Sequence, residues 1–190
     1  DATINSQDDG ISTGVIKLKD RLVIILDFEK IVTDISPETG LKVTEVEDFG
    51  QRRRSDVPIV MAEDSALLNK LISDSLKKSG YTNLVNCVNG KEAWDFISAA
   101  RDDGTLDKKV GLVITDIEMP IMDGHHLTKL IKTDDATKHV PVIIFSSLVN
   151  DEMRRKGEQL GADAQLSKPE TGNLVKEIDN LLDAKSSDAG

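Results

Sequence analysis

From residue 58 onward, short apolar runs alternate with longer stretches in which apolar residues recur every three or four positions. Runs of a few apolar and β-branched residues are typical of buried strands, whereas the longer spacing is typical of amphipathic helices. The alternation predicts an α/β fold, a doubly wound five-stranded parallel sheet with helices on both faces. The expected strands cover residues 59–62, 84–88, 112–115, 142–145 and 164–166.

The expected helices carry recognisable first and last residues. Ser65 is placed to cap a helix that closes at Gly80, because a serine oxygen accepts hydrogen bonds from the free amides of a first turn and glycine suits the residue after a last turn. Asn89, with Glu92 three residues later, resembles a capping box and predicts the start of the next helix. Three further helices are expected around residues 127–131, over residues 151–160 and from Thr171 onward.

Residues 1–56 follow a different pattern. The apolar runs 14–18 and 22–26 predict a β-hairpin, followed by a short helical turn and by a charged stretch that is typical of a linker. A lone hairpin is marginally stable in water, and an apolar strand with free edges invites pairing with another chain. We therefore expect residues 1–40 to be the C-terminal part of a domain that begins before this sequence. A homodimer through these strands remains open.

The formal net charge of −10 over 190 residues argues against binding to nucleic acid and to anionic membranes, because each phosphate contact needs a lysine or an arginine. The one basic cluster, at residues 52–54, is too small to change this and is interpreted as part of the linker. The only cysteine, Cys87, rules out a disulfide framework within these residues and predicts a cytoplasmic protein. No apolar run is long enough to insert in a membrane.

Charged and hydroxyl side chains stand where several of the predicted strands end. Glu63 and Asp64 follow the first strand, Asp116 the third, Ser146 the fourth and Lys168 the fifth. Because the carboxyl ends of parallel strands lie at one edge of a sheet, we expect these side chains to meet there. Three carboxylates in one place would repel each other and raise a pKa unless a cation neutralises them, and Mg²⁺ prefers such oxygen ligands.

A magnesium ion at this edge would let Asp116 remain ionised, and an ionised aspartate is a covalent acceptor of phosphoryl groups. Lys168 would neutralise phosphoryl oxygens, and Ser146 would donate a hydrogen bond to one of them. Movement of that hydroxyl towards the phosphoryl group would shift the loop after the fourth strand and make the site a switch. Each residue also has an ordinary interpretation, such as a helix cap or a surface lysine, but their order over separate strand ends favours the phosphoryl site.

Four separate segments carry a resemblance to the receiver domain of two-component response regulators. The segments are residues 59–64, 115–124, 145–147 and 167–169, and they occur in the family's order. The resemblance covers residues 57–185 and leaves residues 186–190 as a tail. It implies a CheY-like, flavodoxin-like fold and phosphorylation of Asp116 by the phosphohistidine of a histidine kinase. It also implies that Mg²⁺ is held by Glu63, Asp64, Asp116 and the backbone carbonyl of Glu118.

Several positions depart from the family's pattern or vary within it. Receivers commonly carry two aspartates where this chain has Glu63 and Asp64, and the longer Glu63 is expected to reach the metal through water. Many receivers have an aromatic switch residue three positions before the lysine, where this chain has Gln165. Glu118 and Leu148 occupy positions that influence dephosphorylation in the family. We expect a modified phosphoryl lifetime and slow autodephosphorylation, which is the behaviour of a phosphoacceptor switch and not of an enzyme.

Residues 11–35 are similar to the end of a CheW-like coupling domain. A CheW-like domain followed by a receiver is the layout of CheV-type chemotaxis coupling proteins. This resemblance implies a CheA-type histidine kinase as a partner and chemoreceptor arrays as partners of the full-length coupling domain. In this interpretation residues 1–40 are the C-terminal remnant of the coupling domain and residues 41–56 are the linker to the receiver.

Two alternative functions stay open. The first is a stand-alone response regulator, or a phosphate sink, with an unrelated N-terminal extension. The second is a phosphohydrolase with Asp116 as its nucleophile, similar to haloacid-dehalogenase-type phosphatases. Those enzymes need a second aspartate two residues after the nucleophile, and this chain has Glu118 there, which makes the second alternative a poor match.

The adjacent residues His125 and His126 raise the question of a second metal site. No further cysteine, histidine or acidic residue is spaced to complete one. Neighbouring residues of a helix point to different faces, so the two imidazoles would not act together. Both histidines are therefore interpreted as surface residues.

Overall fold

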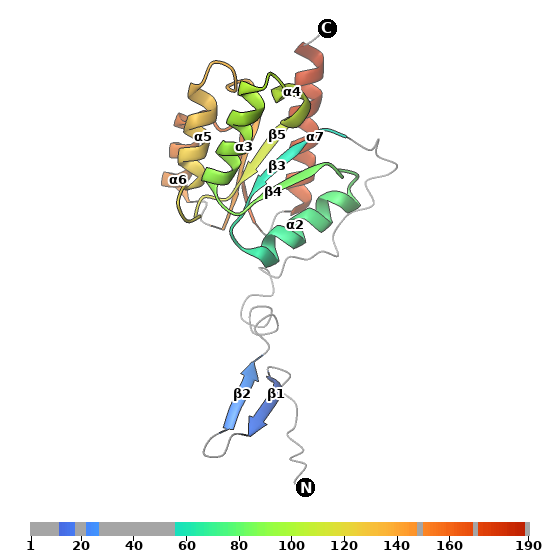
Figure 1. The fold of residues 1–190 in the computed structure, drawn as a ribbon, viewed down its shortest axis with the longest axis vertical. Coiled ribbons are helices and arrows are strands. Elements are labelled where there is room, and N and C mark those ends of the chain that lie inside the picture. Colours follow the sequence, from blue (N-terminus) through green and yellow to red (C-terminus); the bar gives the residue numbers. More distant parts are fainter. Residues whose placement is uncertain (1–11, 18–21, 27–55, 148–149, 169–170, 189–190) are drawn as a thin grey trace. The chain divides into compact units, whose positions relative to one another are not determined.

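The computed structural model describes residues 12–17, 22–26, 56–147, 150–168 and 171–188 (Figure 1). The chain divides into two compact units, residues 1–42 and residues 43–190, and each is described by itself. Within the described ranges, no helix combines the length and the apolar character that a membrane-spanning helix needs.

The first unit contains the predicted hairpin. Strands β1 (Ser12–Lys17) and β2 (Leu22–Leu26) pair antiparallel, and the register shifts between Ser12 and Gly14, as at a β-bulge. The first strand begins two residues earlier than the run 14–18 predicts. The helical turn and most of the linker expected after the hairpin lie outside the described residues.

The second unit confirms the doubly wound parallel sheet (Figure 1). Its strands lie in the order β4-β3-β5-β6-β7, and all four neighbouring pairs are parallel. The chain moves to one side of β3 to form β4 and then to the other side to form β5, so the loops after β3 and β5 diverge and leave a site at the sheet edge. The strands are β3 (Ile59–Ala62), β4 (Leu84–Cys87), β5 (Leu112–Thr115), β6 (Val142–Ser146) and β7 (Ala164–Ser167).

Helices cover both faces of this sheet, as Figure 1 shows. Val60 and Ala62 pack into one core together with residues of α3 and α5, whereas Ile59 and Met61 pack into a second core with residues of α2 and α7. Successive strand residues point to opposite faces, so burial on both sides explains why the strands are continuous apolar runs. The helices are α2 (Ala66–Lys78), α3 (Gly90–Asp102), α4 (Leu106–Lys109), α5 (Gly124–Thr133), α6 (Asp151–Gln159) and α7 (Thr171–Asp188).

The predicted helix caps are present. The Ser65 side chain accepts a hydrogen bond from the amide of Leu68 at 3.3 Å, and Gly80 lies two residues after the end of α2. The Asn89 side chain accepts from the amide of Glu92 at 2.9 Å, while the Glu92 carboxylate reaches back to the amide of Val88. Helix α4 was not predicted from the sequence, because four residues form a single turn and show no periodicity.

Candidate functional site

The sheet brings three of the predicted charged residues into one buried cluster. Glu63 directly follows β3, Asp116 directly follows β5 and Lys168 directly follows β7. Their side chains come from separate elements, yet each residue is at most 7% exposed. The expectation that the carboxyl ends of the strands gather these residues is confirmed by this arrangement.

Lys168 lies at the centre of the cluster. Its Nζ is 2.5 Å from Asp116 Oδ2 and 2.7 Å from Glu63 Oε2, so one ammonium group bridges two buried carboxylates. Burial works against the charge of Lys168, but the hydrogen bonds to Asp116 and Glu63 outweigh it and raise the pKa of the amine. The lysine is therefore held as a cation. The cluster as a whole still carries more negative than positive groups.

The second oxygen of each buried carboxylate is held by its own loop. Asp116 Oδ1 accepts a hydrogen bond from the amide of Ile117 at 2.6 Å, and Glu63 Oε1 accepts from the amide of Ser65 at 3.2 Å. Burial raises the pKa of Glu63, and the charge of Asp116 adds to this rise, against the hydrogen bond from Lys168. Both carboxylates are thus oriented before any ligand arrives.

A third carboxylate completes an oxygen-rich site. Glu63, Asp64 and Asp116 each offer one oxygen, and these oxygens lie within 4.8 Å of one another. Asp64 is exposed, so the cluster is open to solvent on its side. Three carboxylate oxygens match the ligands that a hard cation such as Mg²⁺ prefers, so the residues present fit this metal. The backbone carbonyl of Glu118, in the loop after Asp116, stays a predicted fourth ligand.

The loop after Asp116 is joined to α5 by close backbone contacts. The amide of Gly124 donates to the carbonyl of Ile117 at 3.0 Å. A Cβ atom on Gly124 would lie 1.9 Å from the carbonyl oxygen of Asp116, so only glycine allows this approach. Asp123 caps α5 by accepting from the amide of His126 at 2.7 Å. The residues Asp123 and Gly124 therefore fix the start of the helix against the end of β5.

Ser146 is the last residue of β6 and is buried. Its backbone carbonyl accepts a hydrogen bond from the amide of Lys168 at 3.2 Å, which places it beside the lysine on the neighbouring strand. The structure thus brings Ser146 to the same sheet edge as the acidic cluster, and the role of its hydroxyl stays a prediction. Leu148, at a position that influences dephosphorylation in receivers, lies outside the described residues.

Gln165 occupies the position that is aromatic in many receivers. Its side-chain amide donates to the backbone carbonyl of Arg154 on α6 at 2.8 Å. A Cβ atom on Gly157 would lie only 2.3 Å from Gln165 Oε1, so the amide fills the space that a larger residue at 157 would need. An amide that is packed against α6 therefore takes the place of an aromatic ring.

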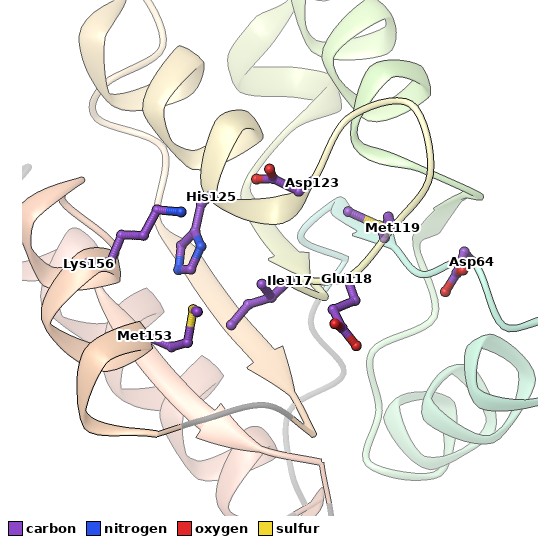
Figure 2. Close-up of a pocket in the computed structure, with 8 residues that line it drawn as sticks. All are labelled: Asp64, Ile117, Glu118, Met119, Asp123, His125, Met153 and Lys156. Carbon is purple, nitrogen blue, oxygen red and sulfur yellow. The ribbon is translucent and has the colours of Figure 1, made fainter.

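The prediction that both histidines lie on the surface was wrong for His125. His126 is exposed, but His125 is 2% exposed and lines a cavity of about 520 Å³ between the loop after β5 and α6 (Figure 2). Neighbouring helix residues point to different faces, so only one of the two can face α6. A signal was present in the sequence, because His125 stands three residues before Thr128, which shares the buried face of α5.

Comparison with known proteins agrees with this geometry. A sequence model of the response regulator receiver domain matches residues 59–179. Chemotaxis protein CheV2 of Helicobacter pylori is 32% identical over 168 residues, which cover 86% of this chain and 50% of CheV2. Chemotaxis protein CheV3 of the same organism is 26% identical over 174 residues, which cover 90% of this chain and 55% of CheV3. The chain thus spans about half the length of these two relatives.

A solved structure with a similar fold is the signal receiver domain of a signal transduction histidine kinase from Syntrophus aciditrophicus. It superposes with a TM-score of 0.58 and 27% sequence identity, and the match covers 67% of this chain and 91% of the other.

Proposed function

The chain belongs to the response regulator receiver domain family, and from this premise we propose that Asp116 accepts a phosphoryl group in the presence of Mg²⁺ and thereby switches the conformation of the domain. The observation that carries the proposal is the contact of buried Asp116 with Lys168, beside two further carboxylates that can hold a metal. An oriented carboxylate next to a fixed cation is suited to a reaction that depends on placement and on charge neutralisation.

The phosphoryl transfer exchanges one bond for another. An oxygen of Asp116 forms a bond to phosphorus while the bond between phosphorus and a histidine nitrogen of the kinase breaks. The electron pair of the broken bond stays on that nitrogen, and the histidine leaves as neutral imidazole because its other ring nitrogen carries a proton. Nothing is oxidised or reduced, and the product is an acyl phosphate on Asp116.

The residues around Asp116 have separate roles in this step. The amide of Ile117 holds Asp116 Oδ1 and so sets the orientation of the carboxylate. Lys168 moves from the carboxylate oxygen to a phosphoryl oxygen, and Ser146 donates its hydroxyl to another. Bound Mg²⁺ would supply positive charge that offsets the charge on the phosphoryl oxygens. It would be held by Glu63, Asp64, Asp116 and the carbonyl of Glu118.

The switch follows from what Lys168 and Ser146 are attached to. The amide of Lys168 donates to the carbonyl of Ser146, so the ends of β6 and β7 are joined. When the hydroxyl and the ammonium group both turn towards a phosphoryl group, the ends of these two strands move with them. Helix α6, which lies between β6 and β7 in the chain, is the element that this movement reaches first.

The wider function follows from the CheV relatives. Their matches extend over 90% and 86% of this chain, which is more than the receiver segment alone. We infer that residues 1–40 are the end of a CheW-like coupling domain, 41–56 a linker, 57–185 the receiver and 186–190 a tail. The phosphodonor is then a CheA-type histidine kinase, and the full-length protein joins chemoreceptor arrays. A homodimer through β1 and β2 stays a further prediction.

The test is phosphorylation by acetyl phosphate with Mg²⁺, followed by intact-mass measurement. We expect one added phosphoryl group in the parent protein, none in Asp116→Asn, and slow loss of the group once acetyl phosphate is removed. Asp95→Asn is the matched control, because Asp95 is exposed on α3 and pairs only with Lys91 in the described contacts. Labelling that persists in Asp116→Asn would overturn the proposal.

A second measurement separates the alternatives. A CheA-type kinase that carries labelled phosphohistidine should transfer its label to the parent protein and not to Asp116→Asn. Sustained hydrolysis of a generic phosphate ester would instead favour a phosphohydrolase. Rapid loss of the phosphoryl group from the kinase, with no change in the conformation of α6, would favour a phosphate sink.

A further inference from the structure

His125 is a buried titratable side chain that the proposed phosphoryl transfer does not use. It is 2% exposed, and its Nε2 atom has no hydrogen-bond partner among the described residues. Figure 2 shows the imidazole between the loop after β5 and α6, with Met153 and Lys156 of α6 beside it. A polar nitrogen that is buried without a partner is unfavourable, so its place in this contact needs a physical reason.

His125 lies between α6 and residues 116–123, the loop that carries Asp116 and that we call the phosphorylation loop. It directly follows Gly124, whose backbone contacts the carbonyls of Asp116 and Ile117. The hydroxyl of Thr128 donates to the carbonyl of Gly124 at 2.7 Å and ties this first turn to the rest of α5. The imidazole therefore lies between a backbone segment fixed to Asp116 and the first turns of α6.

The charges around His125 favour its neutral form. Burial lowers the pKa of His125 below its ordinary value of 6.5, and the nearby ammonium group of Lys156 on α6 lowers it further. Asp123 in the loop before α5 and the backbone of Met153 act in the opposite direction. Glu118 and Asp64 line the same cavity from its far side. The net result is a neutral imidazole at neutral pH.

We propose that His125 is a proton-responsive contact between the phosphorylation loop and α6, closed when the imidazole is neutral and loosened when it is protonated. A protonated imidazole carries two N–H donors, and Nε2 makes no hydrogen bond to the described residues in the closed arrangement. The new charge would also lie beside Lys156. The cavity can admit water, so the first turns of α6 can move outward and let the imidazolium be hydrated.

This inference goes beyond the proposed function, because it requires neither Mg²⁺ nor a phosphoryl group on Asp116. It means that acidification and phosphorylation would both act on α6, one through His125 and the other through Ser146 and Lys168. The two inputs can be tested separately, so the failure of one leaves the other standing.

The test is an NMR titration of the full chain, without metal or phosphodonor, from about pH 8 to about pH 5. The imidazole signals of the three histidines are followed together with the backbone amides of α6. We expect His125 to titrate below the ordinary histidine value of 6.5, and the amides of residues 151–157 to shift with the same midpoint as His125. A His125 that titrates at or above this ordinary value, or that leaves α6 unchanged, would overturn the proposal.

Three variants make the titration decisive. His125→Leu fills the contact with an apolar side chain that cannot be protonated, so the pH-dependent shifts of the α6 amides should be lost. Lys156→Met removes an exposed cation without disturbing the core, so the midpoint for His125 should move to higher pH. His126→Gln is the matched control and should change neither. Shifts of α6 that persist unchanged in a folded His125→Leu protein would contradict the role of His125.

Discussion

Lys168 and Lys132 lie at opposite ends of the same sheet, and their surroundings differ in one decisive way. Lys132 pairs with one carboxylate, Asp163, at 2.7 Å, and its ammonium group also donates to the backbone carbonyls of Val140 and Lys138. Lys168 instead bridges two buried carboxylates, Glu63 and Asp116. The single positive charge of Lys132 is balanced by the single negative charge of Asp163, and its other acceptors are neutral backbone carbonyls. Lys132 therefore connects the segments before β6 and before β7. The cluster around Lys168 is left with excess negative charge, so it is suited to accept a further cation.

The largest expected effect is that of removing the ammonium group from the acidic cluster. Lys168→Met leaves Glu63 and Asp116 buried without a counter-charge, so we expect the free energy of unfolding at neutral pH to fall by about 3 kcal/mol. Urea unfolding followed by circular dichroism measures this change. The same substitution in an Asp116→Asn background should have a smaller effect, because one of the two charges is already absent. Equal losses in both backgrounds would show that the ion pair is not the cause.

Metal binding should give the next largest effect. In the proposed function Mg²⁺ would bind the folded cluster and not the unfolded chain, so a concentration of about one hundred times its Kd should stabilise the protein by about 2.7 kcal/mol. Thermal unfolding with and without Mg²⁺ measures this gain. It should be much reduced in Asp64→Asn, which removes an exposed ligand, and retained in Lys132→Met. Stabilisation that survives in Asp64→Asn would place the metal elsewhere.

The lysine at the other end of the sheet should have a smaller effect on stability. Lys132→Met removes a partly exposed ion pair and two hydrogen bonds to carbonyls, so we expect a loss of about 1 kcal/mol. Phosphorylation by acetyl phosphate should be unchanged, and the mass assay checks this directly. A loss of phosphorylation in a folded Lys132→Met protein would contradict the division of roles between the two lysines.

The smallest expected effect is a dependence on alkaline pH. The pKa of Lys168 is raised in the folded state above the ordinary value of 10.5. A raised lysine pKa contributes stability that is fully present below the ordinary value and is lost as pH rises through the folded value. The difference in unfolding free energy between the parent and Lys168→Met should therefore be constant up to about pH 10.5 and shrink above it. Unfolding curves at a series of alkaline pH values test this.

The fold and the meeting of the acidic residues could be predicted from the sequence for a simple reason. Parallel strands place their carboxyl ends at one edge, so the residue that follows each apolar run has a known position without any side-chain detail. Glu63, Asp116 and Lys168 meet on this basis alone. The pattern could not predict that the ammonium group of Lys168 bridges both carboxylates. That contact depends on the length and conformation of the side chains, and on which carboxylate oxygen already accepts a hydrogen bond from a loop amide.

His125 shows where this reasoning fails. Both histidines were expected on the surface because no further ligand was spaced to complete a metal site with them, but only His126 is exposed. The burial of His125 depends on its packing against α6. This helix lies more than twenty residues further along the chain, and no local sequence pattern predicts its position. The same limit applies to Gln165, whose contact with Gly157 depends on how closely α6 approaches β7.

Gly124 donates its amide to the backbone carbonyl of Ile117 and packs closely against the backbone carbonyl of Asp116. The spacing between the reactive aspartate and the helix that follows is therefore set by the absence of a side chain at Gly124, and not by the side chains that α5 presents elsewhere. A single methyl group at this one position would act as a wedge and uncouple the two.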